Sequence, residues 1–141
     1  MLSGIPGSGK DTYIKNNIGN LDTISLDDIR REMKIKPTDN KGNGQVIQEA
    51  IERCKVKMRV RESFIFNSTN ITRDLRSKWI TLFEEYGGCV DIHYIEVSYD
   101  KLLTQNNNRV YGVPVNVVEK LLNKLEVPTF KEVNNVIYIT E

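Results

Sequence analysis

The sequence predicts an α/β fold, specifically a three-layer α/β/α sandwich around a mostly parallel sheet of four to five strands. Short apolar runs alternate along the chain with segments of helical period, which is typical of strands that alternate with helices. A glycine-rich loop follows the first apolar residues and leads directly into a helix-forming segment. The chain has 141 residues, so we expect one domain spanning residues 1–141.

The first predicted strand is truncated, because only Met1, Leu2 and Ser3 precede the first glycine. Either this strand is a stub and its neighbours carry the sheet, or the native chain begins further upstream; the sequence is compatible with both. Residues 23–26 are expected to form the second strand. The polar, breaker-rich segment 36–44 is expected to be a surface loop.

A helix is predicted from about residue 44 to residue 60, because apolar residues recur there every three or four positions. Basic residues alternate with apolar ones near its end, which is the period of a strand, but the longer helical series favours a helix. These basic residues could follow a nucleic-acid strand. On a helix they spread around the surface, and a solvated face is the preferred interpretation. The apolar series is Val46, Ile47, Ala50, Ile51, Cys54 and Met58, and the basic series is Arg53, Lys55, Lys57, Arg59 and Arg61.

The second half of the chain predicts three further strands and three helices. The strands are expected at residues 63–66, 90–97 and 136–139. The helices are expected at about 73–86, 100–107 and 116–125. Thr72 or Asn70 is a candidate cap for the first of these helices, and Gly87-Gly88 ends it. Its predicted core face consists of Leu75, Trp79, Leu82 and Phe83.

The glycine-rich loop is the clearest chemical signal, because it matches the phosphate-binding loop GxxxxGK. Glycines allow successive backbone N–H groups to point inward at phosphate oxygens, and the following helix adds its N-terminal dipole. Lys10 brings a point charge to the β- and γ-phosphates of a nucleotide. The loop predicts the fold of P-loop NTPases and a phosphate site formed by Gly4, Ile5, Pro6, Gly7, Ser8, Gly9, Lys10, Asp11 and Thr12.

The loop departs from the full motif at its last position, where a Ser or Thr hydroxyl normally holds Mg²⁺. This position is Asp11, and Thr12 follows it. In the favoured interpretation, Asp11 turns outward in the first helical turn and Thr12 supplies the hydroxyl. In the alternative, Asp11 itself takes part in holding the metal. The predicted metal ligand is therefore Asp11 or Thr12.

Four motifs in order resemble the kinase domain of phage-type polynucleotide 5′-hydroxyl kinases, within the adenylate-kinase-like superfamily, over nearly the whole chain. The resemblance implies ATP and Mg²⁺ as cofactors, a nucleic-acid 5′ end as partner, and a phage source with action in the host cytoplasm. The motifs are the phosphate loop, Ser25-Leu26-Asp27-Asp28-Ile29-Arg30, Asn67-Ser68-Thr69-Asn70, and Asn108-Arg109 leading to Val113-Pro114.

The resemblance also implies roles for individual residues. Asp27 would be the general base that accepts the proton of the attacking hydroxyl, and Arg30 would bind the neighbouring phosphate of the acceptor. Arg109 would lie on a lid and stabilise charge on the transferring phosphoryl group, so that the predicted catalytic residues are Lys10, Asp27 and Arg109. Asn70, at a strand end, is a second candidate for acceptor binding.

Alternatives stay open for each of these three roles, of Asp27, Arg30 and Arg109. Asp27 and Asp28 could be a helix N-cap pair. Arg30 could lie on a solvated helix face, and Arg109 could be an ordinary loop arginine. Relatives often carry an acid in the third motif, where this chain has Asn67 and Ser68. The metal site is therefore expected to be rearranged, with compensation by Asp11 as a hypothesis.

Composition limits the classes of partner. The net charge of +1 excludes the bulk electrostatic attraction of a strongly basic nucleic-acid-binding domain. Two cysteines are too few for a disulfide framework, so we expect an intracellular, cytoplasmic protein. No apolar run approaches the roughly 18 residues of a membrane span, so no membrane partner is expected. The single histidine, His93, falls in a predicted strand and is expected to be structural.

The leading function predicted from the sequence is transfer of the γ-phosphoryl group of ATP to the 5′-hydroxyl of DNA or RNA. One alternative is a kinase of a small molecule, a nucleoside or a nucleotide. Another is a nucleotide-binding protein with little catalysis, which the missing loop hydroxyl and the missing third-motif acid favour. The identity of the acceptor and the oligomeric state stay open.

Overall fold

The computed structural model describes residues 1–140 and divides into two compact units. Unit 1 comprises Met1–Gly19 and Thr69–Glu141, and unit 2 comprises Asn20–Ser68. The single domain expected from the length of the chain stays a prediction.

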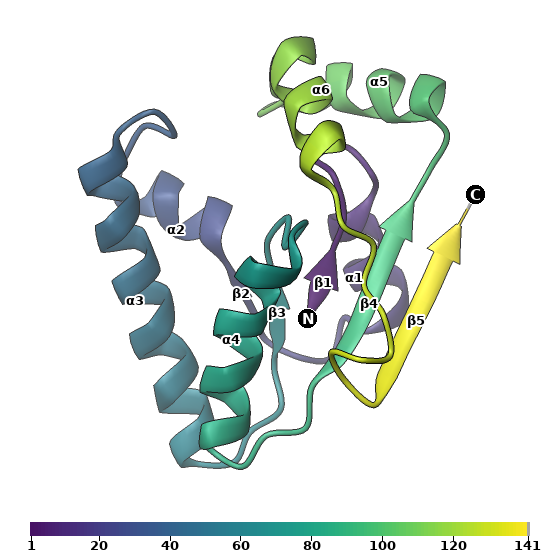
Figure 1. Cartoon of the computed structure of the whole chain (residues 1–141). Coiled ribbons are helices and arrows are strands. Elements are labelled where there is room, and N and C mark those ends of the chain that lie inside the picture. Colours follow the sequence, from purple (N-terminus) through teal and green to yellow (C-terminus); the bar gives the residue numbers. More distant parts are fainter. Residues whose placement is uncertain (141) are drawn as a thin grey trace. The chain divides into compact units, whose positions relative to one another are not determined.

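Unit 1 contains a parallel sheet of three strands in the order β1-β4-β5 (Figure 1). The strands are β1 (Leu2–Ser3), β4 (Asp91–Glu96) and β5 (Asn135–Thr140). Leu2 pairs with His93 in the register of β1 on β4. The truncated first strand is confirmed, since β1 has two residues.

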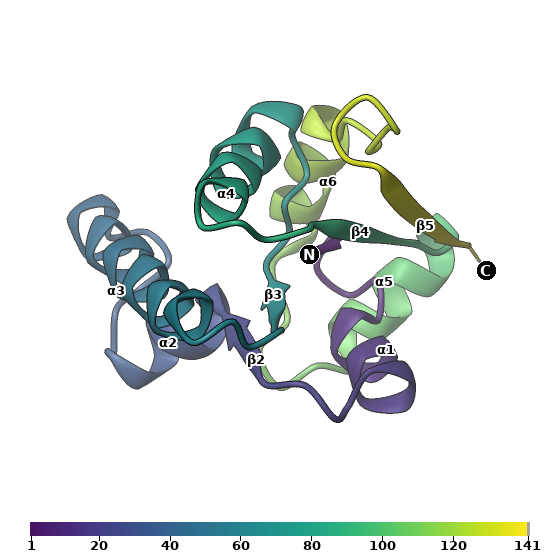
Figure 2. The same cartoon turned by 90° about the horizontal axis from the view of Figure 1, so that it is seen from below.

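Helices cover both faces of this sheet (Figure 2). Ile92 of β4 packs in one cluster with Ile80 of α4 (Arg73–Glu85), whereas the next residue, His93, bonds Tyr13 of α1 (Lys10–Asn17). Successive side chains of a strand point to opposite faces, so α4 and α1 lie on opposite sides of β4. Unit 1 therefore has the predicted α/β/α layers.

Two more helices of unit 1 pack beside the phosphate loop. They are α5 (Tyr99–Asn107) and α6 (Val115–Lys124). Leu102 of α5 and Val118 of α6 form a buried cluster with Ile5 and Ile71. Burial of these apolar side chains stabilises the contact between the loop and the two helices.

The core face predicted for α4 is wrong in part. Thr72 is the N-cap, and its side chain accepts from the backbone N–H of Leu75 at 3.2 Å. Leu75 itself is 45% exposed, and the buried residues of α4 are Arg76, Ile80 and Phe83. A count of apolar positions misses this face because an arginine occupies one of its buried places.

Unit 2 contains the parallel pair β2 (Thr23–Ser25) and β3 (Ile65–Asn67), with α2 (Leu26–Glu32) and α3 (Asn40–Arg59). Helix α3 contacts both α2 and β2. Its buried residues recur every four positions and are Gly42, Val46, Ala50 and Cys54. The helical interpretation of the alternating basic segment is therefore confirmed.

The surface loop predicted at 36–44 is wrong over its second half, because α3 already begins at Asn40. Asp39 is the N-cap, and its carboxylate accepts from the backbone N–H of Gly42 at 2.9 Å. A Cβ on Gly42 would lie 2.5 Å from Cγ2 of Ile35. This glycine permits a close approach at the start of the helix, so it does not mark a loop.

Basic side chains on α3 form ion pairs with neighbouring acids. Arg53 pairs with Glu32 and Glu49, and Lys57 pairs with Asp22 and Glu62. The preferred interpretation of a solvated, charged face is confirmed for these positions. Within residues 1–140, no helix combines the length and the apolar character of a membrane span.

Candidate active site

The loop between β1 and α1 has the curvature expected of a phosphate-binding loop. The backbone N–H of Ser8 donates to Ile5 O at 3.0 Å, which closes a tight turn. Gly7 and Gly9 have φ angles of 90° and 98°. These are left-handed conformations, which glycine adopts without steric cost. The loop therefore needs glycine at both positions.

Close packing fixes the loop from two sides. A Cβ on Gly4 would lie 2.7 Å from Ile95 O and 2.8 Å from Ser8 Oγ. A Cβ on Gly7 would lie 3.0 Å from Cβ of Asn106. The glycines thus allow β4 and α5 to contact the loop backbone directly.

The electrostatics at the start of α1 suit an anion. The N-cap of this helix is Gly9, which has no side chain, and the first N–H groups of a helix point out of its end. Lys10 Nζ donates to Gly4 O at 2.9 Å and to Ile5 O at 3.3 Å. These bonds hold the ammonium group against the start of the loop. Positive charge and backbone donors together fit phosphate groups.

Asp11 and Thr12 are both exposed in the first turn of α1. A carboxylate there is favoured by the helix dipole, which agrees with the outward interpretation of Asp11. No group of three or more His, Cys, Asp and Glu side chains in residues 1–140 could hold a metal ion by itself. Mg²⁺ in phosphotransferases commonly uses one or two side chains together with phosphates and water, which Asp11 or Thr12 fits by chemistry. Either metal role stays a prediction.

Helix α5 connects the phosphate loop to the segment that carries Arg109. Gln105 Nε2 donates to Gly7 O at 2.9 Å. The buried amide of Asn106 bonds to the backbone of Val113, and the backbone N–H of Arg109 donates to Asn106 O at 3.2 Å. Unit 1 therefore brings together the phosphate loop, Lys10 and the segment of Arg109. The predicted lid role of Arg109, which is half-buried, stays a prediction.

In unit 2, the Asp27 motif begins α2. Ser25 is the N-cap, since its side chain accepts from the backbone N–H of Asp28 at 3.3 Å. The alternative of an Asp27–Asp28 cap pair is therefore wrong. Asp27 lies in the first turn, and Arg30 donates to Asp27 Oδ1 at 2.6 Å and to Asn43 Oδ1 at 2.8 Å. The two residues predicted for catalysis and acceptor binding are thus bonded to each other.

Asn70 lies inside unit 1 and is buried, with a φ angle of 44°. Its amide nitrogen donates to Leu2 O at 2.7 Å, and its backbone oxygen accepts from Ser3 Oγ at 2.8 Å. The side chain is therefore engaged with the strand that leads into the phosphate loop. Acceptor binding by Asn70 stays a prediction, and the structure gives the residue a supporting contact that the sequence did not indicate.

His93 has the structural role expected of it. Its Nδ1 lies 2.6 Å from the hydroxyl of Tyr13, which joins β4 to α1. Burial lowers the pKa of His93 and raises the pKa of Tyr13. Both shifts favour the neutral forms, which can share a hydrogen bond without burying a charge.

The profile of the AAA domain family matches residues 1–128. The chain belongs to the AAA domain family. The family is thus shown at the level of the AAA domain, whereas the polynucleotide 5′-kinase family is not specifically supported.

Solved structures show the same fold. This AAA domain is similar to a sugar kinase from Janibacter sp. HTCC2649, at 17% identity and a TM-score of 0.71, over 99% of this chain and 82% of the other. It is similar to a protein from Chloroflexus aurantiacus J-10-fl, provisionally described as a kinase, at 16% identity and a TM-score of 0.75, over 99% and 85%. It is also similar to a gluconokinase from Sinorhizobium meliloti 1021, at 17% identity and a TM-score of 0.65, over 99% and 79%. The predicted α/β fold with a parallel sheet is confirmed.

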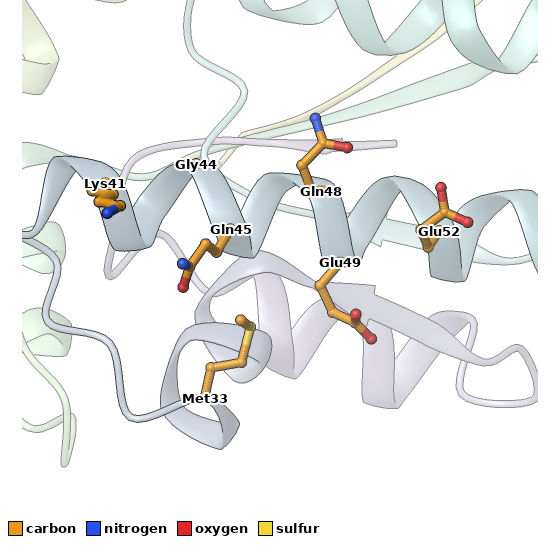
Figure 3. Close-up of a pocket in the computed structure, with 7 residues that line it drawn as sticks. All are labelled: Met33, Lys41, Gly44, Gln45, Gln48, Glu49 and Glu52. Atoms are coloured by element: carbon orange, nitrogen blue, oxygen red, sulfur yellow. The ribbon is translucent and has the colours of Figure 1, made fainter.

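The AAA domain also has an open groove in unit 2, with a volume of about 420 Å³. Gln45 and Glu49 extend from α3 on the side of Met33 (Figure 3). The Glu49 carboxylate accepts from Arg53 at 3.0 Å and is thus already engaged. The groove is lined by none of the residues predicted for the site.

Proposed function

We propose that this AAA domain is an ATP-dependent kinase that transfers the γ-phosphoryl group to a hydroxyl of a small molecule of the sugar or sugar-acid class. One observation carries the kinase proposal. The phosphate loop combines left-handed glycines, the N-terminus of α1 and Lys10 in one unit. Such a loop holds nucleotide phosphates in P-loop kinases.

The acceptor class is supported by the fold and by charge. Two of the similar structures are a sugar kinase and a gluconokinase. Three of the basic residues on α3, Arg53, Lys55 and Lys57, are paired with acids. They therefore do not supply the positive track that a polynucleotide backbone would need. A small uncharged or weakly acidic acceptor needs no such track.

In the proposed reaction, an oxygen of the acceptor hydroxyl forms a bond to the γ-phosphorus, and the bond from that phosphorus to the β,γ-bridging oxygen breaks. ADP leaves with the electron pair of the broken bond, and Asp27 accepts the hydroxyl proton. The loop N–H groups and Lys10 hold the phosphates, and Arg109 offsets the charge that develops on the transferring group. Mg²⁺, when bound through Asp11 or Thr12, would neutralise phosphate charge.

A labelling experiment tests this proposal. The protein is incubated with Mg²⁺ and γ-labelled ATP beside gluconate, a panel of aldoses, nucleosides, and 5′-hydroxyl DNA and RNA oligonucleotides. We expect label on a sugar or sugar acid, and loss of transfer in Lys10→Ala. Label on no acceptor, with ATP still bound, overturns the proposal and favours a nucleotide-binding protein.

A second candidate is the polynucleotide 5′-hydroxyl kinase, which the ordered motifs and the bonded Asp27–Arg30 pair favour. In that reading Arg30 binds the phosphate next to the attacking hydroxyl. Arg30→Gln would then raise the KM of a nucleoside 3′-phosphate far more than the KM of the nucleoside. Label on sugars alone excludes this candidate.

A further inference from the structure

The segment after α5 is held closed by one buried side chain. Asn106, which is 1% exposed, donates from Nδ2 to Val113 O at 2.6 Å and accepts at Oδ1 from Val113 N–H at 3.0 Å. The amide thereby satisfies both backbone groups of a residue seven positions on, as a neighbouring strand would. We call residues 108–113 with the Asn106 side chain the clasped loop.

Backbone contacts add to this closure. The N–H groups of Asn108 and Arg109 donate to Thr104 O and Asn106 O, each at 3.2 Å, and so continue the turn of α5. Gly112 packs so tightly against Asn106 O that a Cβ there would overlap it. The clasped loop is thus closed by side-chain and backbone contacts, and Arg109 lies within it.

Asn106 and its neighbour Gln105 also contact the phosphate loop. Gln105 donates to Gly7 O, and the Cβ of Asn106 lies against Gly7. The phosphate loop and the clasped loop are therefore joined by a single turn of α5. A shift of this turn would therefore move both the phosphate loop and the clasped loop.

We propose that Asn106 is a positioning residue for phosphoryl transfer, because it holds the clasped loop shut and so fixes Arg109 relative to the phosphate loop. This role rests on the proposed function. In this role Asn106 acts through Arg109, since both polar atoms of its amide are bonded to Val113. Arginines that stabilise a transferring phosphoryl group contribute about 10³–10⁵-fold to kcat in related chemistry, and a misplacement of about 1 Å can cost about 100-fold.

The first test is a double-mutant cycle with Asn106→Ala and Arg109→Ala. Alanine keeps the Cβ that packs on Gly7 and removes only the amide. We expect Asn106→Ala to lower kcat about 10- to 100-fold, with an unchanged Kd for a non-hydrolysable ATP analogue. In the Arg109→Ala background the same substitution should have almost no further effect on kcat, because the two residues act as one unit. Asn107→Ala, an exposed neighbour on the same helix, is the matched control.

The second test measures the opening of the clasped loop and does not depend on catalysis. Trypsin cleaves after arginine, so the rate of cleavage after Arg109 reports how often the clasped loop opens. We expect faster cleavage in Asn106→Ala and in Gly112→Ala than in the wild type and in Asn107→Ala, with the fragments assigned by mass spectrometry. Arg109→Ala should abolish the cleavage and thereby identify it.

The outcomes separate this role from the proposed function. A wild type that phosphorylates no acceptor overturns the proposed function and this role with it. An active wild type with unchanged kcat in Asn106→Ala, or with fully additive losses in the cycle, overturns the positioning role alone. Unchanged trypsin cleavage in both variants overturns the clasp itself.

Discussion

Asp27→Asn is the most informative single substitution, because the chain offers a close control for it. Asp27 and Asp28 both lie in the first turn of α2, and each pairs with an arginine three residues on, Arg30 and Arg31. The side chains of Asp27 and Asp28 are 56% and 59% exposed. Asn keeps the shape of the side chain and removes its charge and its capacity as a base.

The structural cost should be the same for both substitutions. An exposed ion pair contributes about 0.2–1 kcal/mol. A carboxylate in the first turn contributes about 0.3–1 kcal/mol through the helix dipole. We expect Asp27→Asn and Asp28→Asn each to lower the free energy of unfolding by about 0.5–2 kcal/mol.

The catalytic cost should differ. A general base contributes about 10²–10⁴-fold to the rate, equivalent to about 3–5 kcal/mol in the activation barrier. Only Asp27→Asn should lose this factor in kcat, and its affinity for ATP should stay close to that of the wild type. Asp28→Asn should keep kcat within about threefold, since a small change in stability leaves the folded population nearly complete.

Three measurements decide the matter. Urea denaturation followed by circular dichroism gives the stability of each variant, calorimetry gives ATP binding, and steady-state kinetics gives kcat and KM with the acceptor found by labelling. Equal kcat values for the two variants, or a larger loss in Asp28→Asn, would refute the assignment of Asp27 as the base. A loss of ATP binding in Asp27→Asn would show that its effect is on the nucleotide.

Three further predictions concern side chains away from the reaction. Arg76→Met should lower the free energy of unfolding by about 3–5 kcal/mol in urea denaturation, because it leaves the nearly buried Glu132 carboxylate without its arginine partner. The double variant with Glu132→Leu should recover part of this loss. Full stability of the single variant would contradict the prediction. Burial lowers the pKa of His93, so the imidazole binds a proton more readily in the unfolded chain than in the folded one. Stability should therefore fall as pH drops below the unfolded pKa of about 6.5. His93→Gln should lose this part of the pH dependence, and identical unfolding profiles of the variant and the wild type from pH 5 to 7 would contradict the prediction. Burial raises the pKa of the Cys54 thiol to about 12, whereas Cys89 is exposed. A chromogenic thiol reagent should react quickly with Cys89, and it should react with Cys54 only after unfolding in guanidinium. Fast reaction of Cys54 in the folded protein would contradict the expected burial.

Helix and strand types followed from periodicity, whereas some boundaries and faces did not. The series Val46, Ala50 and Cys54 predicted a helix at about residues 44–60, and nearly all of these residues lie in α3. Its start was missed because Gly42 resembles a loop residue by composition, and its packing against Ile35 depends on contacts that a local pattern does not contain. The face of α4 was misplaced for a related reason, because a buried arginine is acceptable only when its distant partner is known.

The candidate site shows the same division. Gly4, Gly9 and Lys10 were predictable because the pattern GxxxxGK of phosphate-binding loops has these residue types at a fixed spacing. Asn106 was not singled out, since its partner Val113 is identified only once the chain turns back after α5. Its place four residues after the buried Leu102 was the one available sign, because both fall on the same face of the helix.

The two-residue strand β1 raises a physical question, since it must hold the phosphate loop with very few ladder hydrogen bonds. Further hydrogen bonds join β1 to Asn70. This residue donates to Leu2 O, its own backbone oxygen accepts from Ser3 and from Arg76 at 2.9 Å, and Arg76 is in turn held by Glu132 at 2.7 Å. A buried, fully bonded network of this kind is stiff, because each member loses a partner if another moves. The stub strand is therefore held in part by Asn70, which Arg76 of α4 and Glu132 keep in place, and loosening of Arg76 should weaken ATP binding in addition to stability.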